Sequence, residues 1–235
     1  LHNVQSGKLD EAYENAIFAE DIFIPYYNYV PNRDLLFYII ATIANKKSDT
    51  EEARKYHRLV VHLFPSSSVY KQSAKWLKSH SAKTTLSRQD IAEYLQLNKP
   101  LVYFDLLRII RTNFRIDAID LLVDYAKELE NDEIKLEDCI ETIGVLGDKR
   151  SAPFLKRMLY RAESEETKRS LNFALVLLSE FRHLDEYVRL ELSLGKSLHS
   201  IDELLRETFN GGPTIANVCK KPLKFSSRWR TWLSG

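Results

Sequence analysis

The stretch Ile143-Gly144-Val145-Leu146-Gly147-Asp148-Lys149-Arg150-Ser151-Ala152-Pro153-Phe154-Leu155 decides the fold of this chain, because it holds the turn between two helices. Gly144 is small enough to let two packed helices approach, and Gly147 supplies the left-handed conformation that ends a helix. Asp148 can accept hydrogen bonds from the backbone N–H groups of the next helix, and Pro153 suits the first turn of that helix. The stretch therefore predicts a helical hairpin.

The composition of the whole chain favours the same fold class. Its 235 residues include only 7 Gly and 7 Pro, about 3% each where averages are about 7% and 5%. So few chain breakers disfavour sandwiches, barrels and glycine-rich nucleotide-binding folds. With 44% apolar residues and a net charge of +1, the chain is neither disordered nor attracted as a whole to nucleic acid or anionic lipid. We expect an all-α protein.

Apolar residues recur at helical spacing in both directions from the hairpin. From residue 101 onward the helices pair, and successive pairs begin near residues 101, 135 and 166. A repeat of roughly 31–34 residues is typical of a right-handed α-solenoid of stacked hairpins. The expected helices span residues 9–23, 35–45, 50–64, 70–77, 88–95, 101–112, 116–130, 136–146, 153–162, 165–180, 184–194 and 200–209.

Polar residues mark where several of these helices begin. Asn32, the run at 48–52 and the serines at 66–68 precede apolar helical segments, and Ser87 with Asp90 three residues later resembles a capping box. In contrast, residues 79–85 lack large apolar side chains and form the expected domain boundary. The expected parts are residues 1–80, residues 86–209, and an irregular C-terminal tail or cap at 210–235.

The hairpin stretch at 143–155 resembles the repeats of bacterial HEAT proteins, also called PBS-lyase HEAT-like repeats. The resemblance covers about residues 101–209 and implies a HEAT-like helical solenoid. The end of the chain is similar to the end of such proteins, because the helix at 200–209 is followed by Trp229-Arg230-Thr231-Trp232. The favoured role of Trp229 and Trp232 is to cover the apolar end of the solenoid.

The N-terminal third resembles tetratricopeptide repeats. Residues 7–12 have the G-x-x-x-E-A start of a repeat helix, and Ala19 falls where the motif has a small residue. Residues 50–53 (Thr-Glu-Glu-Ala) repeat the E-A end of that motif, and Pro65 stands at the proline position of the motif. This likeness covers about residues 6–78 and implies tetratricopeptide-like hairpins.

No pattern of catalytic or metal-binding residues is evident. The six histidines form no H-E-x-x-H motif and no zinc spacing with cysteine, and the G-x-S-x-G, P-loop and G-x-G-x-x-G motifs are missing. No apolar run is long enough to span a membrane. Cys139 is expected in the core, although a pairing with Cys219 stays open. The chain starts at Leu1, so we expect the native N-terminus to have been removed, which leaves the compartment open.

Charge is segregated along the chain although its sum is close to zero. Residues 117–138 hold nine acids and two lysines, a net charge of −7, whereas residues 208–235 carry a net charge of +5. The tail could fold along the acidic segment, each region could dock a different partner, or the tail could bind nucleic acid, which is the least favoured. One helix face carries the acids that we call the acidic row: Asp117, Asp120, Asp124 and Glu128. Paired acids can act as catalysts, but here a solvated row is favoured.

Aromatic residues cluster around two prolines near the N-terminus. The cluster comprises Phe23, Tyr26, Tyr27, Tyr29, Phe37 and Tyr38. Packing between helices is the favoured role, and a docking surface is the alternative if the rings are exposed together.

These observations favour a non-enzymatic scaffold or adaptor that binds another protein along the solenoid surface. The HEAT-like resemblance further implies a bacterial source, a larger assembly, and either the cell envelope or the cytoplasm. The alternatives are a HEAT-like enzyme similar to bilin lyases and a nucleic-acid-binding HEAT protein. No catalytic, cofactor or metal residue is assigned. The expected partner-binding residues are Asp117, Asp120, Asp124, Glu128, Tyr26, Tyr27, Tyr29, Trp229 and Trp232.

Overall fold

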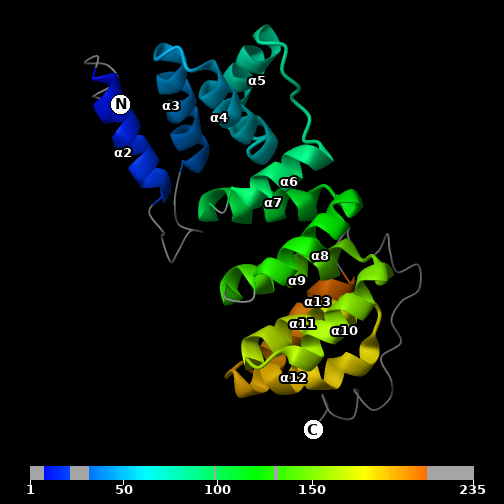
Figure 1. Cartoon of the computed structure of the whole chain (residues 1–235). Helices are drawn as coiled ribbons and strands as arrows, with labels where there is room; N and C mark the ends of the chain where they lie inside the picture. The colour runs from blue at the N-terminus through cyan, green and yellow to red at the C-terminus, as the bar shows by residue number, and fades with distance from the viewer. Residues whose placement is uncertain (1–7, 22–31, 98, 130–131, 211–235) are drawn as a thin grey trace. The chain divides into compact units, whose positions relative to one another are not determined.

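The computed structural model describes residues 8–21, 32–97, 99–129 and 132–210. Within these residues the secondary structure is helical throughout and contains no strand, so the all-α prediction is confirmed (Figure 1). Contacts between Cα atoms divide the chain into two compact units, a first unit at Leu1–Asn113 and a second unit at Phe114–Gly235.

The first unit is built on helix α4. Helix α3 packs between α2 and α4, and α4 also contacts α5 and α7, while α6 packs on α7. Its core includes the fully buried Phe37, Tyr56 and Leu59, and the rings of Phe37 and Tyr56 lie 6.0 Å apart. Its helices are α2 (Leu9–Asp21), α3 (Arg33–Lys46), α4 (Thr50–Leu63), α5 (Tyr70–Ser79), α6 (Arg88–Gln96) and α7 (Pro100–Thr112).

Two of the expected helix starts have the predicted capping geometry. The Asp49 side chain accepts from the Glu52 backbone N–H at 3.0 Å. Ser87 and Asp90 form a complete capping box at the start of α6.

Two other helix starts differ from the prediction. Asn32 precedes α3 in a left-handed conformation, and its side chain makes no capping bond. Helix α5 begins after Val69, and the expected serine cap is replaced by a link to α3, because the Ser67 hydroxyl donates to Asp34 at 2.5 Å. At the start of α5, a contact with another helix has therefore taken the place of the predicted local cap.

The two units divide after Asn113, not at residues 79–85, where the sequence analysis expects the boundary. The reason is that α6 and α7 pack back onto α4. His62 Nδ1 lies 2.8 Å from the Tyr94 hydroxyl, and Arg108 donates to the Leu63 carbonyl at 2.8 Å. The helix pair expected at 101–112 and 116–130 is therefore split between the units.

Helix α11 is the central helix of the second unit and contacts α9, α10 and α12, while α8 packs on α9. The helix expected at 116–130 consists of a 3₁₀ turn followed by α8, and the helix expected at 165–180 ends at Leu177. The elements are η2 (Ile116–Ala118), α8 (Ile119–Glu128), α9 (Glu133–Leu146), η3 (Lys149–Ser151), α10 (Ala152–Arg161), α11 (Glu165–Leu177), η4 (Phe181–His183), α12 (Leu184–Ser193) and α13 (Leu198–Asn210).

The turn at 143–155 has the predicted local geometry. Gly147 ends α9 with φ 72°, the Asp148 side chain accepts from the Arg150 backbone N–H at 2.9 Å, and Pro153 lies in the first turn of α10. Gly144 does permit a close helix approach, but the neighbour is Ala174 of α11 and not the hairpin partner α10.

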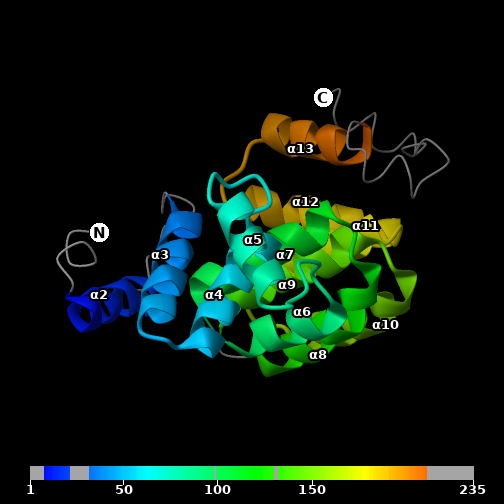
Figure 2. The ribbon, with the colours of Figure 1, turned by 90° about the horizontal axis from the view of Figure 1, so that it is seen from above.

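Helix α13 packs beside α12 and closes the described part of the second unit (Figure 2). Ile201 and Leu205 of α13 join a buried cluster with Tyr187 and Val188 of α12. Cys139 of α9 is fully buried, which confirms its predicted core position. The Trp229–Trp232 motif and Cys219 lie outside the described residues.

Candidate functional site

The acidic row lies in one short region of the second unit, and all of its members are exposed: Asp117 in η2 and Asp120, Asp124 and Glu128 in α8. Arg115 donates to Asp117 at 2.6 Å, and Lys127 donates to Asp124 at 2.7 Å. A catalytic acid pair needs at least one carboxyl group whose pKa is shifted by its surroundings. Their exposed positions therefore give no support to acid–base catalysis by these four carboxylates.

The other predicted binding residues are outside the part of the chain that the structure describes: Tyr26, Tyr27, Tyr29, Trp229 and Trp232. Two members of the aromatic cluster are described. Phe37 is fully buried in the first unit, and Tyr38 is half-buried. Inter-helix packing is therefore the role of Phe37.

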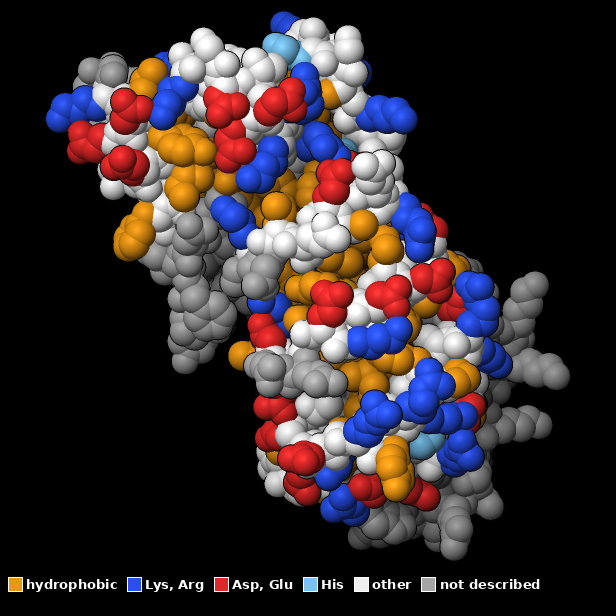
Figure 3. Space-filling model, in the orientation of Figure 1, with side chains coloured by type: hydrophobic (Ala, Val, Ile, Leu, Met, Phe, Trp, Pro, Cys, Tyr) orange, Lys and Arg blue, Asp and Glu red, His pale blue; other side chains and the backbone are white. Residues whose placement is uncertain are grey.

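Helix α10 presents a basic surface that the sequence reasoning missed. The basic face, as we call it, consists of Lys149, Arg150, Lys156, Arg157 and Arg161 in η3 and α10. Residues 149–161 contain no acid, and this charge run shortly after the acidic segment was the available signal. Figure 3 shows acidic side chains over α8 and a cluster of Lys and Arg side chains over α10. Tyr160 stands on the same helix with 92% of its surface exposed.

Only part of the basic face is neutralised within the second unit. Arg150 binds Asp148 through contacts of 2.5–3.1 Å, and Lys156 donates to Glu180 at 2.6 Å. Lys149, Arg157 and Arg161, in contrast, have no carboxylate within ion-pair distance among residues 8–21, 32–97, 99–129 and 132–210. Their guanidinium and ammonium groups are exposed to solvent.

Arg157 and Arg161 line a groove of about 980 Å³ formed by α8, α9, α10 and the start of α11. Its apolar lining consists of Ala126, Leu136, Phe154, Met158 and Ala162. Leu136 and Phe154 are buried, whereas Met158 is half-buried and reaches the groove surface. The groove thus combines an apolar floor with a charged rim of three cations, Lys127, Arg157 and Arg161, and two acids, Glu133 and Glu163.

Polar contacts hold the helices that form this groove. Lys127 Nζ of α8 lies 6.0 Å from the centre of the Phe154 ring of α10. Thr167 of α11 donates to Glu133 of α9 at 3.1 Å, and its backbone N–H donates to the capping hydroxyl of Ser164 at 3.1 Å. Lys127 and Glu133 of the groove lining therefore already have contacts within the second unit.

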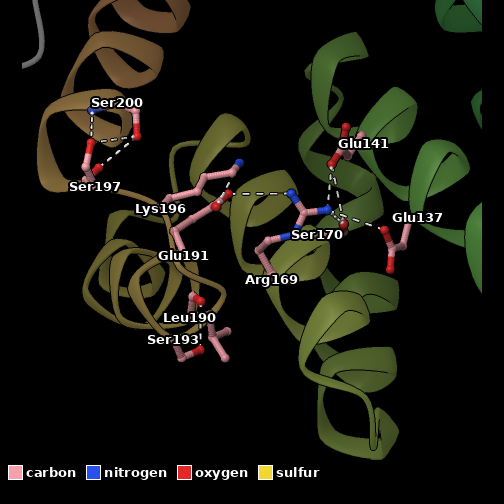
Figure 4. A network of polar contacts seen from close by, with 10 residues as sticks. All are labelled: Glu137, Glu141, Arg169, Ser170, Leu190, Glu191, Ser193, Lys196, Ser197 and Ser200. Atoms are coloured by element: carbon pink, nitrogen blue, oxygen red, sulfur yellow. Dashed lines mark hydrogen bonds and ion pairs between the residues drawn. The ribbon is translucent and has the colours of Figure 1, made fainter.

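A second network, centred on Arg169, ties α9, α11 and α12 together (Figure 4). From α11, the Arg169 guanidinium lies 3.3 Å from Glu137 and 3.7 Å from Glu141 of α9, and 3.5 Å from Glu191 of α12. Glu191 is fully buried, with Lys196 Nζ 2.8 Å from its carboxylate. Burial alone would raise the pKa of Glu191, but the hydrogen bond and charge of Lys196, with the charge of Arg169, hold it below its usual value. The network fixes two of the helices that line the groove.

The first unit contains a buried serine–histidine pair, which is a possible nucleophile–base arrangement. His57 Nδ1 lies 3.1 Å from Ser73 Oγ, and His62 Nδ1 lies 2.8 Å from the Tyr94 hydroxyl. Ser73 is fully buried, and burial lowers the pKa of both histidines to about 4. The His57 ring also stacks on Trp76 with centroids 4.5 Å apart. His57, His62 and Ser73 are thus all buried in the packing of the first unit.

Within the described residues, no group of three or more His, Cys, Asp or Glu side chains is arranged to hold a metal ion. None of the described helices combines the length and the apolar character that a membrane span needs. Comparison of the chain with protein-family models, with curated proteins and with solved structures gives no match. The charged surfaces and the groove of the second unit are therefore the features of the described residues that indicate a function.

Proposed function

We propose that this chain is a protein-interaction scaffold built as a right-handed α-solenoid, tetratricopeptide-like in its N-terminal part and HEAT-like in its second unit. The local geometry of the turn at 143–155 supports this reading. Gly147 and Pro153 stop and restart the helix, while Gly144 lets α9 approach Ala174 of α11. Close stacking between helices of successive hairpins is what a solenoid needs to bury a continuous core.

The observation that carries the binding proposal is the segregation of opposite charges on neighbouring helices. Helix α8 carries the exposed Asp120, Asp124 and Glu128, and α10 carries the exposed Arg157 and Arg161 of the groove lining. Figure 3 shows acidic side chains over α8 and basic side chains over α10. Adjacent rows of opposite sign orient a partner, because a reversed partner would bring like charges together. All five side chains are exposed, so folding does not require this arrangement.

A protein partner suits this surface better than a small substrate. The groove is open to solvent, its charges lie on the rim, and a small-molecule site would enclose most of its ligand. An extended charged surface beside an apolar groove instead provides the apolar centre and polar surround of a protein interface. In this proposal the chain holds another protein within a larger bacterial assembly.

Charge reversal of the acidic row tests this function. The full chain carrying Asp117→Lys, Asp120→Lys and Asp124→Lys should no longer co-purify its partner from the native source, because the partner would face cations on α8 as well as on α10. Circular dichroism should show unchanged helix content, since all three side chains are exposed.

A matched variant separates a local effect from a change in total charge. Glu11→Lys, Glu14→Lys and Glu51→Lys alter the charge by the same amount at exposed positions on α2 and α4 of the first unit. This variant should retain the partner. If the folded α8 variant also retains it undiminished, the surface formed by α8 and α10 is not the interface.

A further inference from the structure

We propose that the groove between α8, α9, α10 and α11 binds an acidic, amphipathic segment of the partner protein. In this arrangement two carboxylates of the segment bind Arg157 and Arg161, and its apolar side chains cover the groove floor. The inference rests on the proposed scaffold function and adds the chemistry of the bound segment.

The two arginines define the charge of the ligand. Arg157 and Arg161 are exposed, four residues apart on α10, and without an ion-pair partner in the described part of the chain. Side chains four residues apart on a helix have Cβ atoms about 5–6 Å apart. The pair therefore matches two carboxylates one helical turn apart on a ligand, and each planar guanidinium can bind a carboxylate through two parallel hydrogen bonds.

The groove floor defines the apolar part of the ligand. Phe154 and Leu136 form its buried base, and the half-buried Met158 lies between the two arginines in the sequence of α10. An unbranched methionine side chain can adapt its shape to different apolar groups. An apolar floor beside two arginines that have no ion-pair partner among the described residues is suited to an acidic amphipathic helix laid into a groove.

Carboxylates around the groove favour a peptide over a nucleic acid. Glu133 and Glu163 also line the groove, and Asp124, whose side chain is 71% exposed, stands beside Lys127 on the α8 rim. A nucleic acid carries a dense row of phosphates that would pass these acids. A peptide, in contrast, can place its two carboxylates at the arginines alone.

The chain offers a direct probe, because Met158 is its single methionine and lines the groove. The full chain, labelled with ¹³C at the methionine methyl group, is titrated with a synthetic helical peptide of about four turns. The peptide carries leucines along one face and glutamates one turn apart beside them. We expect a saturable shift of the Met158 methyl signal, and no shift with a peptide in which lysines replace the glutamates.

Matched double variants test the arginines. Arg157→Glu with Arg161→Glu should weaken peptide binding by about tenfold or more, because attraction becomes repulsion. Lys71→Glu with Lys75→Glu makes the same charge change at two exposed positions four residues apart on α5 of the first unit. Because charges outside the groove are screened by salt, that variant should change the dissociation constant by less than about twofold. Circular dichroism confirms that both variants are folded.

Three outcomes would overturn the proposal: equal affinity for the two peptides, unchanged affinity of the folded arginine variant, or a Met158 shift with a single-stranded oligodeoxynucleotide but not with the acidic peptide. The last result would make the groove a phosphate site. If the peptide fails while the α8 reversal still releases the native partner, the scaffold function stands without this ligand. If the peptide binds and the native partner is still retained after the α8 reversal, the groove ligand stands and the surface formed by α8 and α10 is not the interface with the native partner.

Discussion

Gly144 on α9 lies so close to Ala174 on α11 that a Cβ atom at Gly144 would stand 2.7 Å from the Cα atom and 2.9 Å from the Cβ atom of Ala174. The nearest atom belongs to the backbone, so no side-chain rotation can relieve the overlap. The helices would have to separate. The packing of α9 on the central helix α11 therefore depends on the absence of a side chain at Gly144.

Gly144→Ala should therefore lower the free energy of unfolding by about 1–3 kcal/mol, the usual cost of overpacking a core. Urea denaturation followed by circular dichroism measures this change. The higher helix propensity of alanine would by itself raise the free energy of unfolding by about 1 kcal/mol. A measured decrease would therefore identify the steric overlap with Ala174 as its cause. A variant as stable as the parent protein would contradict the close approach.

Arg169→Met should destabilise the second unit by removing the cation shared by Glu137, Glu141 and the fully buried Glu191. We expect a loss of about 2–3 kcal/mol, below the largest values for broken buried pairs because Lys196 still binds Glu191. The measurement is the urea midpoint of unfolding.

Arg189→Met is the control, because it removes an arginine from an exposed pair with Glu186 on α12. Surface pairs contribute little to stability, so its midpoint should stay close to that of the parent protein. Equal effects of the two substitutions would show that the Arg169 network has no special role.

The stability of the first unit should fall as the solution is acidified. Burial, aided by the positive charges of His80 and Arg58, lowers the pKa of His57 and His62 to about 4 from 6.5. Well above pH 6.5 both imidazoles are neutral in the folded and the unfolded chain. As the pH falls through 6.5 towards 4, only the unfolded chain takes up protons, so the free energy of unfolding falls across that window. From about pH 7.5 to 5.5 each histidine should remove about 1 kcal/mol.

Denaturation at a series of pH values measures that slope. His57→Gln and His62→Gln should each flatten the pH dependence, even where the substitution also lowers the stability itself. His199→Gln, an exposed position on α13, should leave the slope as it is. A slope that persists without both buried histidines would assign the acid sensitivity to other groups.

Cys139 should be inert to thiol reagents in the folded protein, because it is fully buried and its Sγ lies 3.5 Å from the Leu122 carbonyl. In a Cys219→Ser variant, labelling by a disulfide reagent should be slower than in urea by at least on the order of a hundredfold, because it requires local unfolding. Immediate labelling without denaturant would show that the packing of α8 on α9 does not cover this thiol.

The helices could be predicted from the sequence because their signals are local. The capping box of Ser87 and Asp90 and the stop at Gly147 each involve residues within one turn. The unit boundary could not be predicted in this way, because it depends on contacts between distant positions. The hydrogen bond from Arg108 to the Leu63 carbonyl joins residues 45 apart in sequence.

The candidate site was partly visible in the sequence. The acidic row at 117–128 follows helical spacing, and the five basic residues at 149–161 could have been found by counting charges. The groove could not, because its floor combines Ala126, Leu136 and Phe154 from three helices. Nor does the sequence show which cations are neutralised, since Lys156 pairs with Glu180, 24 residues away.

Cross-linking mass spectrometry on the native complex tests most directly whether the second unit binds a partner protein through α8 and α10. Amine-reactive cross-links to the partner should fall on Lys127, Lys149 and Lys156, which lie on those helices or in the turn before α10. Partner cross-links that fall only on the first unit, at exposed residues such as Lys71 and Lys75, with none on α8 or α10, would contradict this binding surface.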